Sequence, residues 1–306
     1  MITRTLIRQK VVQILYAYLL RENTNVEAAE KELTFSLGKA YDLYLYLLLL
    51  MVEVKHFAED RIALRRLRLQ PTDADLHPNL RFVENQFICQ LEQNNELAER
   101  RKSLKRSWKD AEDVVRKLFE TIERSDIYCD YMNAPVAPTY DDDRMLWRKI
   151  YKQFIMDNDA LDSLFEEQSL YWNDDKAVVD TFVLKTIKQF DPTQGADQAL
   201  LPQYHDKEDP EFAHTLLRRA LKNADTYREL INEQSSNWTG ERIAFMDTVI
   251  MIAALAELTS FPSIPLNITL NEYVEIAKFY STPSSASFIN GILDTAAKKI
   301  RASQPR

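Results

Sequence analysis

Glycine is scarce in this chain, and the scarcity restricts the folds open to it. The 306 residues include four glycines, at positions 38, 195, 240 and 291. Sheet-rich folds and phosphate-binding loops need many tight turns, where glycine adopts backbone conformations that strain other residues. Hydrophobic residues make up 45% of the chain, enough for a sizeable core. The sequence therefore predicts an all-α fold, and its length allows about two domains.

Proline-rich stretches divide the predicted helices. Apolar residues recur at helical spacing over residues 5–20, and separate helices are expected at 27–37 and 41–68. A second linker follows residue 190, where prolines and a glycine cluster. Further helices are expected over residues 80–128 (long helices), 141–156, 159–168, 174–190 and, with breaks, 211–301.

The most apolar segment lies at residues 43–52, between Asp42 and Glu53. It is about half as long as the ~20 residues that span a bilayer, so it predicts a buried helix and no membrane association. No small-residue cleavage site follows the apolar stretch near the start, so a signal peptide is not expected. Cys89 and Cys129 cannot form a disulfide framework, which fits a reducing compartment. These features predict a cytoplasmic protein.

Catalytic patterns are missing from the sequence. It has no glycine-rich nucleotide loop, its histidines lack zinc-ligand spacing, and its cysteines have no Cys-x-x-Cys partner. The acidic runs at residues 141–143 and 174–175 are typical of helix N-termini, where carboxylates complement the helix dipole. We therefore expect no enzyme activity, no cofactor and no metal site.

Positive charge is concentrated at the start of the chain. The formal net charge is −8, yet residues 1–21 contain four basic residues and no acid. A nucleic-acid contact is therefore expected to be local. Two other basic clusters, at residues 61–68 and 100–106, are more typical of solvated helix faces, with phosphate contact as the alternative.

A proline-marked turn and two helix starts lie near the C-terminus. Residues 261–280 read FPSIPLNITLNEYVEIAKFY, and residues 284–294 read SSASFINGILD. Residues 274, 276, 277 and 279 are expected to form the apolar side of the first helix, and Ser284 or Ser285 can cap the second. Tyr280 and Phe288 flank this turn, where an aromatic ring can stack on an unpaired base. Core packing is the alternative, above all for Phe288.

Both ends of the sequence resemble the NusB family of bacterial transcription antitermination factors. Residues 4–17, RTLIRQKVVQILYA, resemble the family's arginine-rich first helix with its Gln-x-Leu-Tyr segment. Residues 242–258 and the segments NEYVEIAK and FINGILD resemble the family's last helices. The resemblance implies a NusB-like helical bundle of two subdomains, enlarged by a helical insertion. It divides the chain into N-terminal NusB-like helices (1–64), the insertion (65–205) and a C-terminal NusB-like helical domain (206–306).

The predicted insertion contains an internal similarity. The pattern from Asp159 to Trp172 recurs 66 residues later, from Asp225 to Trp238, and Asp180-Thr181 recurs as Asp247-Thr248 with one residue inserted. This repetition predicts a duplicated helix pair, and chance likeness between amphipathic helices is the alternative.

The resemblance also implies a function. NusB proteins bind boxA-type single-stranded RNA of ribosomal RNA leaders together with NusE, a small-subunit ribosomal protein, and so act indirectly on the RNA polymerase antitermination complex. Asp247 matches an acidic position at the NusE interface. The RNA-contacting residues implied here are Arg4, Arg8, Lys10, Tyr16, Tyr280, Ser284, Ser285 and Phe288.

Several positions depart from the family pattern. Thr5 and Leu6 stand where arginines can occur, Ser284 replaces a frequent acid, and the chain is about twice the length of typical members. A helical protein-interaction scaffold that has lost RNA binding is therefore the alternative function. An RNA methyltransferase with a NusB-like domain would need a glycine-rich cofactor loop, and the sequence has none.

Overall fold

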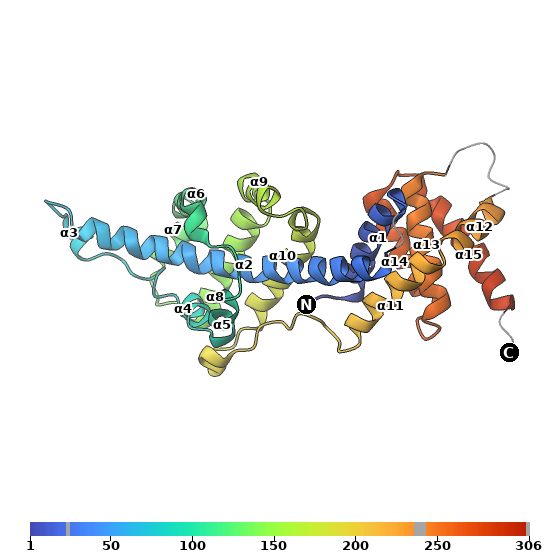
Figure 1. Ribbon diagram of the computed structural model, residues 1–306. Coiled ribbons are helices and arrows are strands. Elements are labelled where there is room, and N and C mark those ends of the chain that lie inside the picture. The colour runs from blue at the N-terminus through green and yellow to red at the C-terminus, as the bar shows by residue number, and fades with distance from the viewer. Residues whose placement is uncertain (23–24, 236–242, 304–306) are drawn as a thin grey trace. The chain divides into compact units, whose positions relative to one another are not determined.

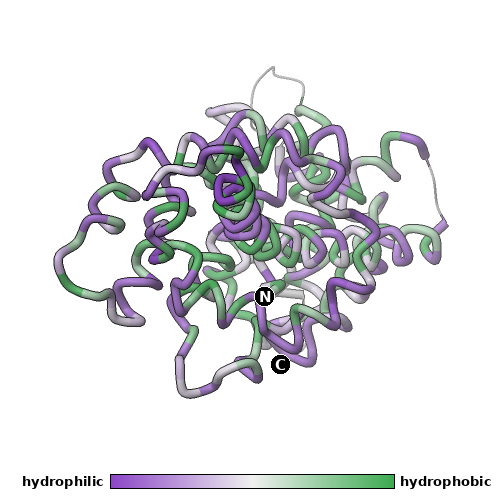
Figure 2. Tube along the Cα trace, turned by 90° about the vertical axis from the view of Figure 1, so that its left-hand side faces the viewer, coloured by the Kyte–Doolittle hydropathy of each residue, from purple (hydrophilic) through white to green (hydrophobic). Residues whose placement is uncertain are grey.

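The computed structural model describes residues 1–22, 25–235 and 243–303. Within these residues the regular secondary structure is helical, apart from an isolated parallel bridge between Ile2 and Tyr204 (Figure 1). The predicted all-α fold is confirmed. Figure 2 shows hydrophobic and hydrophilic stretches alternating along the helices, as amphipathic helices require.

The α-helices are α1 (Arg4–Leu20), α2 (Val26–Arg66), α3 (Asp73–Leu76), α4 (Gln86–Glu92), α5 (Asn95–Arg101), α6 (Glu112–Glu123), α7 (Asp126–Asn133), α8 (Tyr140–Ile150), α9 (Asp159–Gln168), α10 (Trp172–Gln189), α11 (Asp209–Lys222), α12 (Ala224–Ser235), α13 (Phe245–Ser260), α14 (Leu266–Tyr280) and α15 (Ser285–Ser303). The short helical segments are the 3-10 helix η1 (Trp108–Ala111), the π-helix η2 (Tyr151–Ile155) and the 3-10 helix η3 (Pro192–Asp197).

The chain forms two compact units. Residues 2–38 and 203–306 make one, here called the terminal unit, and residues 39–202 with Met1 make the other, the central unit. The divisions fall at residues 38/39 and 202/203, whereas the sequence placed domain boundaries after residues 64 and 205. The first difference arises because α2 is one uninterrupted helix that contributes residues to both units.

Helix α13 forms the centre of the terminal unit. It packs against α1, α11, α12, α14 and α15, and every residue from Val249 to Glu257 is buried. A helix that is apolar around its whole circumference can only be stable when other helices cover it. The terminal unit therefore brings the first helix of the chain onto α11, α13 and α14.

The core of the central unit forms around the apolar part of α2. The ring of Tyr46 stacks on Trp108 at 4.1 Å between centroids and lies 5.5 Å from Trp172. By length and composition α2 could cross a membrane, but 78% of its most apolar window is buried in the protein. Burial of this kind is typical of a core helix.

Two sequence-based helix predictions need correction. Residues 27–37 and 41–68 were expected as separate helices, yet α2 is continuous through Gly38. No proline interrupts α2, and a mid-helix glycine costs only about 1 kcal/mol. The long helices expected over residues 80–128 are instead short. The side chains of Asn85 and Asn94 each accept a hydrogen bond from a backbone N–H group, and each residue thereby caps the start of a new helix, α4 and α5.

The internal similarity falls on two helix pairs, α9–α10 and α12–α13. Trp238, which matches Trp172 in the second copy, lies outside the described residues. The duplication stays a prediction.

Candidate nucleic-acid interface

Arg8 on α1 is buried and forms an ion pair. Its side chain donates from Nε and Nη2 to Glu257 on α13, at 2.7 and 2.8 Å. Its Nη1 lies 3.4 Å from Glu272 on α14. Burial by itself lowers the pKa of Arg8, but the hydrogen bond and charge of Glu257 outweigh it, and the pKa is raised overall. Only 3% of Arg8 is exposed. Its guanidinium therefore binds carboxylates inside the protein and does not face the solvent.

Glu257 is the centre of this polar network. It is fully buried, and it also accepts hydrogen bonds from the hydroxyls of Thr269 (2.8 Å) and Tyr273 (3.2 Å). Burial, together with the Glu257 charge, raises the pKa of Tyr273 well above its usual value. A buried charge is tolerated when partners surround it in this way. The network therefore holds α1, α13 and α14 together.

The other two predicted cationic contacts differ in exposure. Lys10 is 1% exposed. The Arg4 side chain is 36% exposed, and its Nε lies 3.3 Å from the buried carboxylate of Asp209. The Arg4 guanidinium also lies over the Phe212 ring, 4.9 Å from its centroid. Of the three predicted cations, Arg4 is the one whose side chain reaches solvent to a substantial extent.

Tyr280 lies beside α1. Its hydroxyl accepts a hydrogen bond from Gln13 Nε2 at 2.9 Å, and its ring is half-buried. Tyr16 is also half-buried, and its ring contacts Phe245 edge-on at 5.1 Å. Arg4 precedes Gln13 by nine residues, about 13 Å along the helix axis. The structure therefore brings the end of α14 to the middle of α1, with Arg4 farther along the same helix.

The turn between α14 and α15 is fastened by Asp247. This carboxylate is 5% exposed and accepts hydrogen bonds from the hydroxyls of Ser281 and Ser285, the latter at 2.8 Å. Ser285 is buried, whereas Ser284 is exposed and Phe288 is half-buried. Asp247, predicted as a partner contact, thus has both carboxylate oxygens engaged inside the terminal unit, and it sets the conformation of the turn.

Phe279 was missed by the sequence analysis. It was placed on the apolar side of its helix, but the structure leaves it 66% exposed. The buried side of α14 follows Tyr273, Ile276 and Ala277. Positions 273, 276, 277 and 280 share one helical face, and Phe279 falls outside that pattern. Strict use of helical spacing could therefore have identified the exposed ring.

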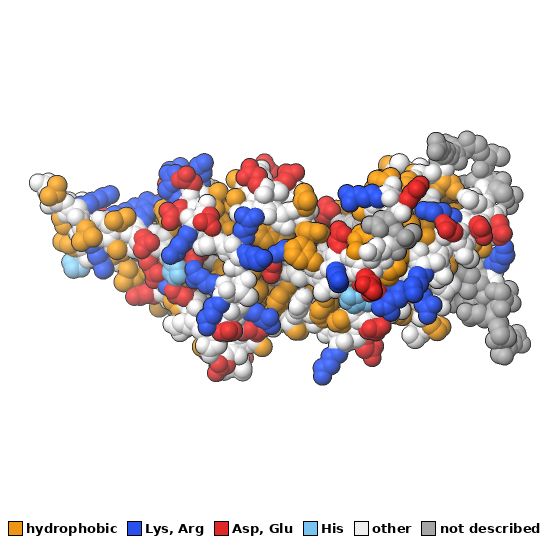
Figure 3. Space-filling model, in the orientation of Figure 1, with side chains coloured by type: hydrophobic (Ala, Val, Ile, Leu, Met, Phe, Trp, Pro, Cys, Tyr) orange, Lys and Arg blue, Asp and Glu red, His pale blue; other side chains and the backbone are white. Residues whose placement is uncertain are grey.

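The basic clusters of the central unit are engaged with acids. Arg61 and Arg65 both pair with Glu123, at 2.7 and 3.8 Å. Arg101 pairs with Glu53 at 3.0 Å. These pairs reduce the positive charge available to phosphate groups at either cluster. Hydrophobic side chains also reach the surface around α3 (Figure 3).

A cluster of metal-ligand type also lies in the central unit. Ligand atoms of His56, Glu59 and Glu92 lie within 4.8 Å of one another. The Lys55 ammonium lies 2.8 Å from Glu59 and 2.6 Å from Glu92. Hydrogen bonds and charges from Glu53 and Glu92 raise the pKa of His56 to about 9. The Lys55 ammonium and the His56 imidazole both pair with the Glu92 carboxylate, so this cluster is built as a network of ion pairs.

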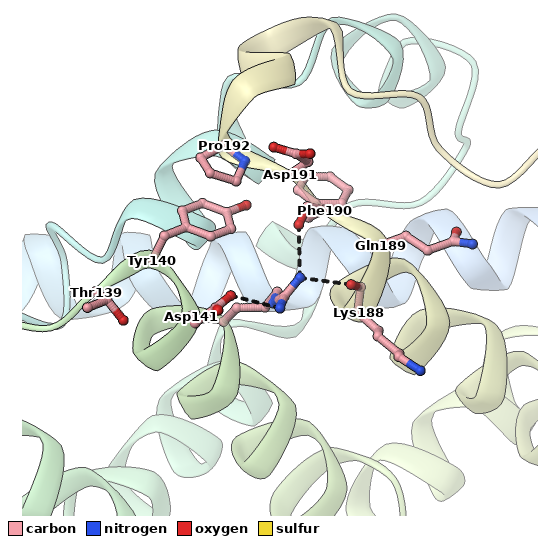
Figure 4. Close-up of a pocket in the computed structure, with 9 residues that line it drawn as sticks. Thr139, Tyr140, Asp141, Lys188, Gln189, Phe190, Asp191 and Pro192 are labelled. Carbon is pink, nitrogen blue, oxygen red and sulfur yellow. Dashed lines mark hydrogen bonds and ion pairs between the residues drawn. The ribbon is translucent and has the colours of Figure 1, made fainter.

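One hollow of the central unit is shaped by the arginine at position 144. Residues 139–141, 144 and 188–192 line it (Figure 4). The Arg144 guanidinium donates to Asp141 and to the backbone carbonyls of Lys188 and Phe190, at 2.8, 2.8 and 3.1 Å. It thereby satisfies carbonyls at the C-terminus of α10. The side chains of Arg144 and Asp141 are therefore used within the fold.

Comparison with known proteins identifies the family. The model of the NusB family matches residues 181–298, from within α10 to α15. The transcription antitermination protein NusB of Salinibacter ruber is 37% identical over 118 residues, covering 37% of this chain and 74% of that protein. Its namesake from Geotalea daltonii is 36% identical over 133 residues, covering 44% and 89%. No solved structure matches the chain. Because this chain covers most of the length of relatives to which it is more than one-third identical, it belongs to the NusB family.

Proposed function

We propose that this chain is a non-enzymatic RNA-binding transcription antitermination factor that binds boxA-type single-stranded RNA of ribosomal RNA leaders together with NusE. The supporting observation is the contact between Gln13 and Tyr280, which unites α1 with the α14–α15 turn on one surface. The two curated relatives described above are transcription antitermination proteins by name. The protein would act in the cytoplasm as part of the RNA polymerase antitermination complex, which it would contact indirectly.

The exposed groups of this surface suit a single strand. Unpaired bases can stack on the rings of Tyr280, Phe288 and Tyr16, whereas a duplex keeps its bases stacked on one another. The exposed hydroxyl of Ser284 can contact phosphate or a base edge. Arg4 supplies the phosphate contact, while the buried Arg8, Lys10 and Ser285 contribute by holding the surface in place.

The NusE contact is assigned to the face that includes Asp247. Its carboxylate is held by Ser281 and Ser285, so NusE bound at this face would adjoin the α14–α15 turn. Such an arrangement would couple NusE binding to RNA binding. We further propose that residues 65–205 are an insertion into the family core, although the family match already begins at residue 181.

A salt-dependent RNA titration tests the proposal. Fluorescent boxA RNA is titrated with the full chain, with and without NusE, at two salt concentrations. We expect NusE to tighten binding, and salt to weaken it with a log–log slope of about −0.7 for each phosphate contacted. Arg4→Ala should reduce the size of that slope by about 0.7. Lys222→Ala is the matched control, since Lys222 is an exposed cation 13 residues beyond Asp209 on α11, about 20 Å away along the helix.

The alternative is a helical scaffold without RNA binding. The observation that favours it is the engagement of Arg8 with Glu257 and of Arg4 with Asp209. NusE binding with no measurable affinity for boxA RNA at either salt concentration would support the scaffold and exclude our proposal.

A further inference from the structure

The exposed aromatic ring at the end of α14 is unusual in its setting. Phe279 is 66% exposed, beside a buried helix face. Single exposed apolar side chains are common and need no explanation by themselves. Phe279 differs because its ring contacts the ring of Tyr280 at 5.0 Å between centroids, and Tyr280 belongs to the surface that we assign to RNA.

The Phe279 ring rests on an anchored neighbour. The Tyr280 hydroxyl is fixed by Gln13 on α1, and Phe279 contacts the Tyr280 ring with 67° between the two planes. Edge-to-face contact is a favoured arrangement of aromatic pairs. A ring ordered before binding loses less conformational entropy when a ligand arrives, so this pair is prepared for a planar ligand.

The charged residues beside Phe279 favour a nucleobase over an apolar protein partner as its ligand. Its exposed neighbours on the helix are Glu275 and Lys278, which form an ion pair at 2.6 Å. An apolar partner that covered the ring would also cover these charges and pay for their desolvation. A nucleobase can place its face on the ring while its polar edges stay in water.

We infer that Phe279 is a further base-stacking residue, and that Phe279 and Tyr280 together receive two neighbouring bases of a single strand. Because the two ring planes are inclined by 67°, bases stacked on them cannot remain stacked on each other. The ligand is therefore a flexible, unpaired RNA segment and not a duplex end. This inference rests on the RNA-binding function proposed above and assigns a residue that the sequence analysis placed in the core.

Substitutions at one position separate stacking from simple apolar contact. We expect Phe279→Ala to weaken binding of fluorescent boxA RNA by about 5- to 150-fold, the usual effect of losing a stacked base. Phe279→Leu keeps apolar area without a π-face and should weaken binding almost as much. Phe279→Trp should retain the affinity, and RNA should quench the emission that this variant gains over the wild-type protein.

Ile268→Ala is the matched control. Ile268 is an exposed apolar residue on the same helix, 44% exposed, and lies 11 residues before Phe279, about 16 Å along the axis. RNA affinity should not change in this variant. Far-UV circular dichroism and thermal unfolding of each variant establish that the fold is intact.

The outcomes distinguish this inference from the proposed function. If Tyr280→Ala weakens RNA binding but Phe279→Ala does not, the inference is overturned and the function stands. If neither variant affects an RNA complex that does form, or no complex forms, the proposed interface itself fails. Full affinity in Phe279→Leu, or loss of NusE binding alone in Phe279→Ala, would identify Phe279 as an apolar protein contact and overturn its stacking role.

Discussion

Gln13 and Tyr280 are separated by 267 residues in the sequence, and the Gln13 side chain donates a 2.9 Å hydrogen bond to the Tyr280 hydroxyl. This bond connects α1 to the end of α14. It fastens the aromatic side chain of Tyr280 to the surface of α1. The ring's orientation therefore depends on a glutamine that carries no charge and need not contact RNA.

Removing this bond should loosen Tyr280. We predict that Gln13→Ala costs about 0.5–1.5 kcal/mol in unfolding free energy, the usual net value of a hydrogen bond, and weakens boxA RNA binding by a few-fold. Gln9→Ala, one helical turn earlier on α1, is the control and should leave both unchanged. Urea denaturation and fluorescence anisotropy measure the two effects. Equal RNA affinity in both variants would show that the bond does not organise the RNA surface.

The Arg8–Glu257 pair should matter for stability. Arg8→Ala leaves the buried Glu257 charge without its main partner, and such a change typically costs 3–5 kcal/mol. Chemical denaturation should therefore show a large fall in the unfolding free energy. The double variant Arg8→Met/Glu257→Gln removes both charges and should recover much of the loss. A double variant no more stable than Arg8→Ala would argue against charge burial as the cause.

Asp247 should stabilise the α14–α15 turn whether or not a partner is bound. In Asp247→Ala, the hydroxyls of Ser281 and Ser285 lose their acceptor, and we expect a loss of about 1–2 kcal/mol in unfolding free energy. RNA affinity measured without NusE should also fall, because the turn that carries Ser284 is released. Asp247→Asn, which keeps one acceptor oxygen, should retain more of both. If RNA affinity falls only when NusE is present, Asp247 is a partner contact without a role in the turn.

His56 should make stability depend on pH. Its pKa is raised from 6.5 to about 9 in the folded protein, so the folded state binds the proton more tightly. The stabilisation is fully present below pH 6.5 and is lost as pH rises through 9. With allowance for solvent screening, we expect a loss of about 1–2 kcal/mol across this interval. Urea denaturation of the wild type and His56→Gln measures it, and the variant should show a flatter profile.

The fold class could be predicted from the sequence, but the burial of its charged side chains could not. Few glycines and helical periodicity indicate helices because those signals are local. The burial of Arg8 depends on Glu257, 249 residues away. No spacing rule connects the two, so a cation in a basic helix was interpreted as exposed. The exposure of Phe279, by contrast, could have been predicted from local sequence. Helical spacing places position 279 outside the face shared by residues 273, 276, 277 and 280.

The wide separation of Arg8 and Glu257 has a consequence for protein synthesis. Ribosomes add about 5–20 residues per second, so roughly 12 to 50 s pass between the emergence of the arginine and that of its counter-ion. At the end of that interval α1 still lacks a complete α13 to cover it, whereas all of residues 39–202 have already been synthesised and can fold. Nascent chains halted after residues 39–202 have emerged, but before α13 has, should therefore contain a folded central unit and an α1 that is still accessible to proteases or chaperones.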